Sequence, residues 1–192
     1  MIAKEIEKKL VQWSAANSGY DEHRPYIGLS GIGDCSLLIW RRFFNHTGAS
    51  TESRLKTRYS YEIEEDIKRR LQAIGIYSPG KEISIYDGLV KGHTDGEINK
   101  DLLEIATIPL TEYLPHINHI PSKKLYQSQA YMLYGHYDRA LILYFARDYG
   151  VFRIFDLHRD PVMDDRIMSK VDALVEFVRA KVPPPCDCGK CR

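Results

Sequence analysis

Five short runs in the chain after residue 80 are mainly hydrophobic and are separated by polar positions, which predicts β-strands. The first three are "EISIY" from residue 82, "LVKGHTDGEI" from 89 and "DLLEIATI" from 101. Asp87-Gly88 and Asn99-Lys100 separate these runs with turn-forming residues, so we expect them to form a meander. The last two runs, "RALILYFAR" and "VFRIFDLH", are joined at Tyr149-Gly150.

Hydrophobic positions that recur with a helical period predict helices at about 3–16, 35–45, 52–74, 122–136 and 161–181. Asp160-Pro161 supplies a cap and a first residue for the last of these. Ser30 or Asp34 is the expected cap of the second. We expect a loop at 110–121.

This order of helices and strands predicts an α/β or α+β domain with a central mixed β-sheet flanked by helices. The length of 192 residues suits a single domain, 1–192, that buries a sizeable core. Within this domain we expect N-terminal helices in 1–50 and a cysteine-bearing tail at 183–192.

The composition is that of a soluble globular protein, with 44% hydrophobic and 28% charged residues. No apolar run approaches the ~20 residues that span a bilayer, and the N-terminus lacks the apolar segment of a signal peptide. We therefore expect a cytoplasmic protein that makes no membrane contact. The net charge of +1 excludes a polycationic DNA-coating protein, although a local basic strip remains compatible with DNA binding.

Short basic clusters occur at Arg41-Arg42, Lys68-Arg69-Arg70 and Lys123-Lys124. Each cluster alone is typical of a solvated helix face. If the protein binds DNA, the candidate phosphate contacts are Arg41, Arg42, Lys123 and Lys124.

Two acidic residues lie on neighbouring predicted strands. If these strands pair through the turn at 99–101, Asp95 and Glu104 come together, and carboxylate oxygens are what Mg²⁺ prefers. Glu104 lies within the apolar run "LLEIATI", where an acid without a partner is costly. A lysine at 106 would share the face of Glu104, but this residue is Ala106. The alternative is an exposed hairpin with ordinary surface acids.

The helix at 52–74 offers a third acid. Its expected buried stripe consists of Ile63, Ile67, Leu71 and Ile74. Glu64 is the acid nearest to this stripe, so we expect its side chain to reach the interior. The alternative is an acidic surface helix with ion pairs to Lys68 and Arg69.

In this combination the sequence resembles the PD-(D/E)XK nuclease superfamily, in particular its RecB-like exonuclease branch. That branch includes CRISPR-associated and phage recombination exonucleases. Its pattern is a helix acid or histidine, G-H-x-D-G on one strand, E-h-K on the next, and Q-x-x-x-Y on the following helix. This chain has Glu64, "GHTDG" from 92, "EIA" from 104 and "QSQAY" from 127, and the match covers roughly residues 30 to 191.

The resemblance implies a restriction-endonuclease-like fold and a site for Mg²⁺ or Mn²⁺. Asp95 and Glu104 would bind the metal with the backbone carbonyl of Ile105, and Glu64 would bind it directly or through water. The implied substrate is DNA, as a single strand or a duplex end.

Three more positions complete the motif. Gln127 and Tyr131 would hold the substrate backbone or the attacking water, with interior packing as the alternative. Ala106 replaces the motif lysine, which implies a site that binds metal and DNA but cleaves poorly. An engineered Lys→Ala substitution fits this departure best. A natural substitution, with a lysine supplied by Lys91 or Lys123, is the alternative.

The four cysteines are Cys35 and, in the tail, Cys186, Cys188 and Cys191. In a reducing compartment such a cluster favours a metal over disulfides. The one-plus-three layout is similar to that of RecB-like nucleases with an iron–sulfur cluster, which implies a 4Fe-4S centre. Zinc is the alternative for four thiolates, and unligated thiols are a third reading. The centre would fasten the tail to the N-terminal helices and have a structural role.

We therefore expect a metal-dependent DNA exonuclease that acts in phage or bacterial recombination or repair, in a form impaired by Ala106. A recombination partner protein and a homo-oligomer are further expectations. The alternative is a non-catalytic nucleic-acid-binding or assembly subunit, in which Ala106 is natural.

Overall fold

The computed structural model describes residues 5, 6, 9, 12, 25–45, 51–116 and 118–189, except for the side chains of 51–56 and 116. Residues 5, 6, 9 and 12 are helical, and the remainder of the helix expected at 3–16 lies outside the described residues. Cys191 lies outside them too. No helix in the described part of the chain is both long and apolar enough to cross a membrane.

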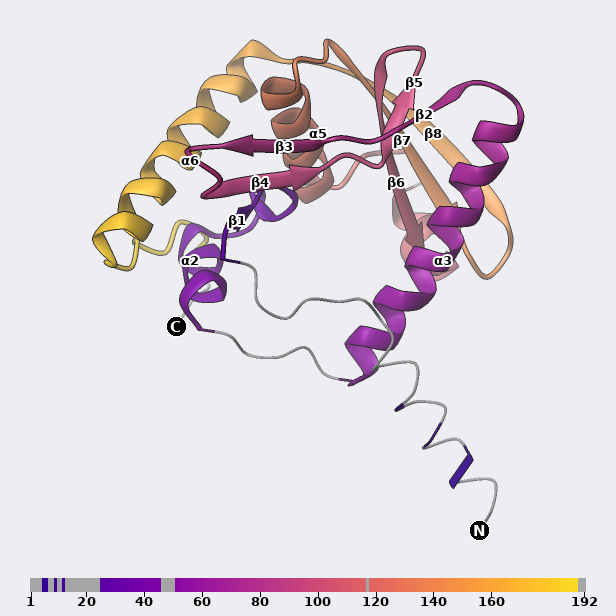
Figure 1. The fold of residues 1–192 in the computed structure, drawn as a ribbon, viewed down its shortest axis with the longest axis horizontal. Coiled ribbons are helices and arrows are strands. Elements are labelled where there is room, and N and C mark those ends of the chain that lie inside the picture. Colours follow the sequence, from indigo (N-terminus) through magenta and orange to yellow (C-terminus); the bar gives the residue numbers. More distant parts are fainter. Residues whose placement is uncertain are drawn as a thin grey trace.

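A five-stranded mixed sheet forms the centre of the molecule (Figure 1). In order across the sheet its strands are β2 (Tyr77–Pro79), β5 (Gly96–Ile98), β6 (Asp101–Ile108), β7 (Arg139–Ala146) and β8 (Val151–His158). Among the described strands of this sheet, only the β6–β7 pair is parallel. A parallel pair needs a crossover connection, and α5 (Ser122–Gly135) lies within it. The central mixed sheet with flanking helices is therefore confirmed.

A second, three-stranded sheet contains β1 (Ile27–Gly28), β4 (Val90–His93) and β3 (Glu82–Ile85), in this order. The predicted meander is wrong here, because the run from residue 89 breaks at Thr94-Asp95 and continues as β5 in the other sheet. Side chains take over backbone hydrogen bonds at the break. The Thr94 hydroxyl accepts from Lys81 N at 2.9 Å, and Asp95 Oδ2 accepts from Ile105 N at 2.7 Å.

One face of the large sheet is covered by α3 (Thr51–Ala73). Ile67 and Leu71 of this helix pack against a buried cluster of Leu103, Ile105 and Leu143. Ile74 departs from the predicted stripe and is 67% exposed, because the helix ends at Ala73 and the chain turns away.

The other face is covered by α5, with α6 (Pro161–Ala180) packed against it (Figure 1). Asp160 caps α6 as predicted, since its Oδ1 accepts from Val162 N at 2.9 Å. The loop expected at 110–121 contains two short helices, α4 (Leu110–Tyr113) and η2 (Leu114–His116). The buried ring of Tyr113 fixes α4 against β7.

A short η1 helix (Leu29–Gly31) precedes α2 (Ser36–Phe44), whose N-cap position is Cys35. The expected caps Ser30 and Asp34 are therefore wrong. The cap comes from the tail, which returns to α2 after α6 (Figure 1). The Asp187 carboxylate accepts from Ser36 N at 3.1 Å and from Ser36 Oγ at 2.5 Å.

Candidate active site

Asp95 and Glu104 meet at the edge where β5 begins beside β6. The β5–β6 register pairs Gly96 with Leu103, and one further step outward sets Asp95 opposite Glu104. Tyr77 fixes the Asp95 backbone, because its hydroxyl donates to Asp95 O at 2.9 Å. The N–H and C=O of one strand residue point to the same edge, so the Ile105 carbonyl lies on the side of its N–H, which bonds Asp95.

Glu104 is fully buried and keeps one oxygen open. Its Oε2 accepts from Lys124 Nζ at 2.7 Å and from Gln127 Nε2 at 2.8 Å. Its Oε1 has no hydrogen-bond partner among the described residues. A buried oxygen without a donor is costly, and a cation would satisfy it.

One face of α5 points at this carboxylate. Lys124, Gln127 and Tyr131 lie three and four positions apart, so they share that face. Tyr131 is only 2% exposed, and its hydroxyl lies within hydrogen-bonding reach of the Gln127 side chain and the His93 backbone. A Cβ at Gly92 would come within 2.5 Å of Tyr131 Cε1. The first glycine of "GHTDG" and the tyrosine of "QSQAY" therefore fit against each other.

Glu64 approaches the same edge of β6 from α3. Its Oε1 accepts from the buried Thr107 hydroxyl at 3.4 Å. Glu64 also lines an open cleft of about 320 Å³ together with Thr57, Ser60 and Tyr61. The interior orientation predicted for Glu64 is therefore what the structure has, with access to solvent through the cleft.

The carboxylates share one electrostatic environment. Burial, and then the Asp95 charge, raises the pKa of Glu64 to about 7. Burial raises the pKa of Glu104 to about 8, with Asp95 and Glu64 adding to the increase and Lys124 opposing it. Burial disfavours the charged form of Lys124, but Glu104 and Asp95 outweigh it and raise the pKa of this ammonium. The site therefore concentrates negative charge that a cation can compensate.

The donor set fits a hard divalent cation held by few protein ligands. Mg²⁺ is usually bound through one or two carboxylates and several waters, and Asp95 with the open oxygen of Glu104 meets this need. Within the described part of the chain the three carboxylates do not form a close-packed ligand trio; only three cysteines bring such atoms all within 4.8 Å of one another.

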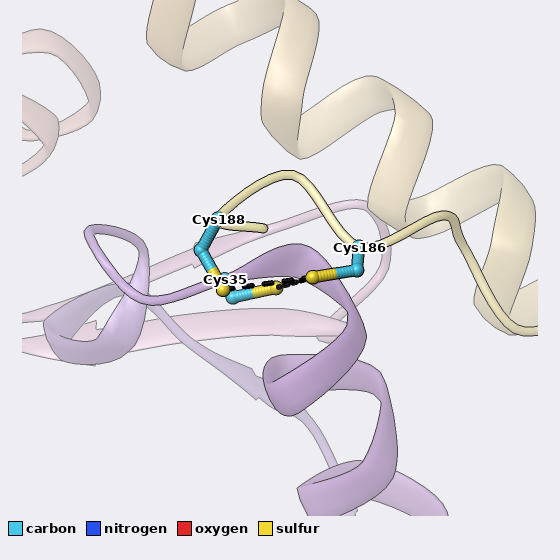
Figure 2. Close-up of side chains that lie close together, drawn as sticks. All are labelled: Cys35, Cys186 and Cys188. Carbon is cyan, nitrogen blue, oxygen red and sulfur yellow. Dashed lines mark hydrogen bonds between the residues drawn. The ribbon is translucent and has the colours of Figure 1, made fainter. Parts of the chain in front are cut away.

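These three cysteines form a second candidate metal site. Figure 2 shows Cys35, at the start of α2, with Cys186 and Cys188 of the tail, all with their sulfur atoms directed toward one another. The Sγ atoms of Cys35 and Cys186 are 3.9 Å apart, and those of Cys186 and Cys188 are 3.6 Å apart. None of the three forms a disulfide. A tetrahedral ion with metal–sulfur bonds of about 2.3 Å separates its sulfurs by about 3.8 Å. A cluster holds its thiolates on different irons, so a 4Fe-4S centre would require wider spacing.

Asp187 lies between two of these thiols in sequence and binds the same helix end. Burial would raise its pKa, but hydrogen bonds from Cys35 and Ser36, with the Lys170 charge, lower it to about 2. Lys170 Nζ lies 3.5 Å from Asp187 and donates to Asp34 O at 2.6 Å. Helix α6 therefore takes part in holding the tail against α2.

The predicted phosphate contacts lie in three different environments. Arg42 and Lys123 both bind Asp34, at 2.5 and 3.0 Å, and lower the pKa of that carboxyl, although burial opposes them. Arg41 is exposed on α2. Lys124 instead points inward to Glu104, which the sequence analysis did not anticipate. The helical spacing of Lys124 from Gln127 and Tyr131 was the sequence signal that could have identified Lys124 as an inward-facing residue.

No family model matches this sequence, and no curated protein matches it. Among solved structures, the fold is similar to LHK-Exo in complex with dAMP, with a TM-score of 0.65 and 16% identity over 88% of this chain and 93% of that chain. A second structure of this alkaline exonuclease, from Laribacter hongkongensis, gives 0.62 and 16% over the same shares. SSO0001 gives 0.57 and 14%, over 92% of this chain and 87% of that chain. The chain thus has a restriction-endonuclease-like fold, which is also that of an alkaline exonuclease.

Proposed function

We propose that this chain is a metal-dependent DNA exonuclease of the RecB-like type. The observation that carries the proposal is the buried Glu104, which lies opposite Asp95 and keeps one oxygen open among donors from α5. A buried acid with a strongly raised pKa, next to a second acid, is typical of a functional site. The fold shared with an alkaline exonuclease supports the same activity.

The reaction would be hydrolysis of a phosphodiester. The oxygen of a water forms a bond to phosphorus, the bond from phosphorus to the sugar oxygen of the leaving group breaks, and one proton passes from the water to solvent while the leaving oxygen gains one. A divalent cation, Mg²⁺ or Mn²⁺, would neutralise phosphate charge and make the water more acidic. Asp95 and Glu104 would hold that cation, and Glu64 would orient a water at its side. Gln127 would keep the Glu104 carboxylate in place.

The substrate would be a DNA end or single strand that enters along α3. The cleft at Glu64 has a volume of about 320 Å³, and Arg147 donates a hydrogen bond to Oγ of its lining residue Ser60 at 3.4 Å. LHK-Exo, which shares the fold, is known in complex with dAMP, and this supports a nucleotide as the bound group. Arg41 and Arg42 remain candidates for phosphate contacts further along the strand.

We propose that the cysteines hold a metal with a structural role. The resemblance favours a 4Fe-4S cluster, and the sulfur spacing favours a single zinc ion. The visible spectrum of anaerobically purified protein separates them, because only the cluster absorbs broadly near ~400 nm. Several expectations stay predictions: a role in phage or bacterial recombination, a partner protein, a homo-oligomer, a cytoplasmic location and the impairment by Ala106.

Degradation of end-labelled linear DNA with Mg²⁺ or Mn²⁺ tests the main proposal. The chain as it is and an Ala106→Lys form are compared with Asp95→Ala and Glu104→Ala, each made in both backgrounds. We expect either carboxylate change to slow release of nucleotides by more than about 100-fold. Asp101→Asn on the same strand, where the acid binds Arg139 at 3.2 Å, is the matched control. A closed circular DNA should stay intact, since it offers no end.

A non-catalytic nucleic-acid-binding or assembly subunit is the second candidate, and Ala106 is the observation that favours it. It predicts DNA binding without cleavage in both the natural and the lysine-containing form. Absence of cleavage by both forms, with either metal on single strands and duplex ends, would establish this candidate instead.

A further inference from the structure

Position 106 lies on the face of β6 that carries Glu104 and that α5 covers. Ala106 pairs with Tyr144 across the β6–β7 register. A side chain longer than alanine at this position would extend from the sheet on the same face as the Glu104 side chain. Position 106 is therefore a neighbour of the buried carboxylate on one face of the strand.

Lys124 extends its ammonium toward the same face of β6 from α5. Its Nζ lies 2.7 Å from Glu104 Oε2, and the side chain is only 14% exposed. The ammonium interacts electrostatically with Glu104, Asp95 and Tyr144, the last being the partner of Ala106. A lysine at 106 and the lysine at 124 would thus bring the same group to the same point from two different elements.

The other lysines near the site form their ion pairs with other carboxylates. Lys91 Nζ lies 3.2 Å from Glu82, and Lys123 Nζ lies 3.0 Å from Asp34. Lys68 interacts electrostatically with Asp95, but its ammonium binds Glu65 at 3.0 Å and comes from α3, which covers the opposite face of β6. Among these four lysines, only Lys124 contacts a carboxylate of the candidate active site.

We propose that Lys124 is the catalytic lysine of this chain and takes the role that the sequence motif would assign to position 106. This inference rests on the proposed nuclease function. With a cation on the carboxylates, the ammonium would turn from Glu104 to the phosphate oxygen or the attacking water. It would supply positive charge, form no covalent bond and keep its protons. The chain would then be an active enzyme, contrary to the impairment expected from Ala106.

The test removes the lysine from α5 and introduces a lysine on β6. Lys124→Met keeps an apolar stem of similar length and removes the charge. The proteins compared are the natural chain, Lys124→Met, Ala106→Lys, the double variant and Asp95→Ala, with melting temperatures to verify folding. We expect the natural chain to degrade DNA, Lys124→Met to be slower by about 100-fold, and Ala106→Lys in the Lys124→Met background to recover at least about 10-fold. Lys100→Met, in the exposed β5–β6 turn, is the charge-matched control.

A second readout does not depend on activity. Lys124→Met should bind Mn²⁺ several-fold more tightly in a calorimetric titration without DNA. Removing the ammonium removes a repulsion that acts on Mn²⁺, with its two charges, more strongly than on the single proton that competes with it for the carboxylates. Lys100→Met should leave the affinity unchanged. Equal Mn²⁺ affinity for Lys124→Met and the natural chain would overturn the assignment.

The outcomes separate this inference from the proposed function. If Lys124→Met cleaves as fast as the natural chain while Asp95→Ala is inactive, the nuclease stands and Lys124 is not its lysine. If only the proteins carrying Lys at 106 cleave DNA, the nuclease function likewise stands and Lys124 is again not its catalytic lysine. If no protein of the set cleaves any DNA end with Mg²⁺ or Mn²⁺, both the function and the inference fail.

Discussion

Asp95 stands where β5 begins, and its carboxylate accepts the Ile105 N–H that a continuing strand would have paired. The interruption leaves β6 beyond Leu103 without a strand partner on that side, and it is there that we propose the metal binds. At the scale of single residues, the site therefore depends on a side chain that replaces a backbone hydrogen bond. The motif "GHTDG" was the sequence signal for Asp95 as a site residue. The break between β4 and β5 was not predictable, because polar and non-polar positions continue to alternate through it.

The raised pKa values of Glu64 and Glu104 predict a pH dependence of both folding and metal binding. A carboxyl whose pKa is higher in the folded protein stabilises it below the unfolded value near 4.5, and this contribution is lost as pH rises through about 7 and about 8. The metal-free protein should therefore lose stability as pH rises from about 4.5 to about 8. Over the same range its Mn²⁺ affinity should rise, because fewer protons must be displaced from the carboxylates. Calorimetric titrations at about pH 6 and about pH 8.5 measure the change. Glu104→Gln should reduce it, and equal affinities at both pH values would contradict the assignment.

Gly92 provides a second prediction at this scale. Gly92→Ala would bring a methyl group within 2.5 Å of the Tyr131 ring and 3.0 Å of Leu29 Cβ. Neither neighbour can move freely, since both are buried, so we expect a loss of about 1–3 kcal/mol in the free energy of unfolding. Gly28→Ala is the control, because its nearest contact would be Ser30 Oγ at 3.6 Å. Urea unfolding of the two variants would contradict the packing argument if both lost the same amount.

At the scale of elements, α5 supplies the side chains that surround the Glu104 carboxylate. It closes the parallel crossover between β6 and β7, and its one inward face presents Lys124, Gln127 and Tyr131. The helix and its bounds were predictable from periodicity. The sequence did not indicate which of the adjacent Lys123 and Lys124 points inward, because neighbouring helix positions differ only by the rotation of one residue. In the fold, Lys123 contacts Asp34, and Lys124 points inward to Glu104.

The cap of α2 is a tertiary contact, and this is why local sequence signals missed it. Ser30 and Asp34 are near the helix start, yet the carboxylate that binds Ser36 belongs to Asp187, 151 positions away. A cap of this kind has no signature in the residues around the helix. The same applies to β1 and β2, which are too short to show a period and exist by pairing with β4 and β5.

Asp187→Ala tests this cap. We expect a loss of about 1 kcal/mol in unfolding free energy, because two donors at the start of α2 lose their acceptor. The lowered pKa means that this stabilisation is present above about pH 4 and is lost as pH falls toward about 2. Asp160→Ala removes the local cap of α6 and should cost a similar amount. Only Asp187→Ala should also weaken metal binding by the cysteines, as measured by competition with a chelator.

At the scale of the whole molecule, the tail joins the C-terminal part of the described chain to the start of α2. Cys186, Asp187 and Cys188 all contact the start of α2, and Lys170 of α6 adds an ion pair. The pairing of Cys35 with the tail cysteines was expected from the family layout. The contribution of Asp187 was not, because a single acid between two cysteines resembles any polar tail residue.

Cys188→Ser and Cys35→Ser should destabilise the protein to the same extent. If both thiolates bind one metal, each substitution removes a ligand, and metal-binding free energy in such sites is also folding free energy. We expect a loss of several kcal/mol in each variant, with the metal affinity of Asp95 and Glu104 much less affected. Thermal melting and metal analysis of the purified variants measure this. Destabilisation by Cys188→Ser alone would mean that Cys35 is only a buried core thiol.

The tail contact also sets an order of events during synthesis. Ser36 leaves the ribosome long before Asp187 exists, since 151 residues separate them. At about 5–20 residues per second, α2 waits roughly 8–30 s for its cap and for Cys186 and Cys188. All strands of the central sheet precede the tail, because β8 ends at His158. A released chain that is truncated before residue 186 should therefore have a folded sheet and an α2 that is still open to protease.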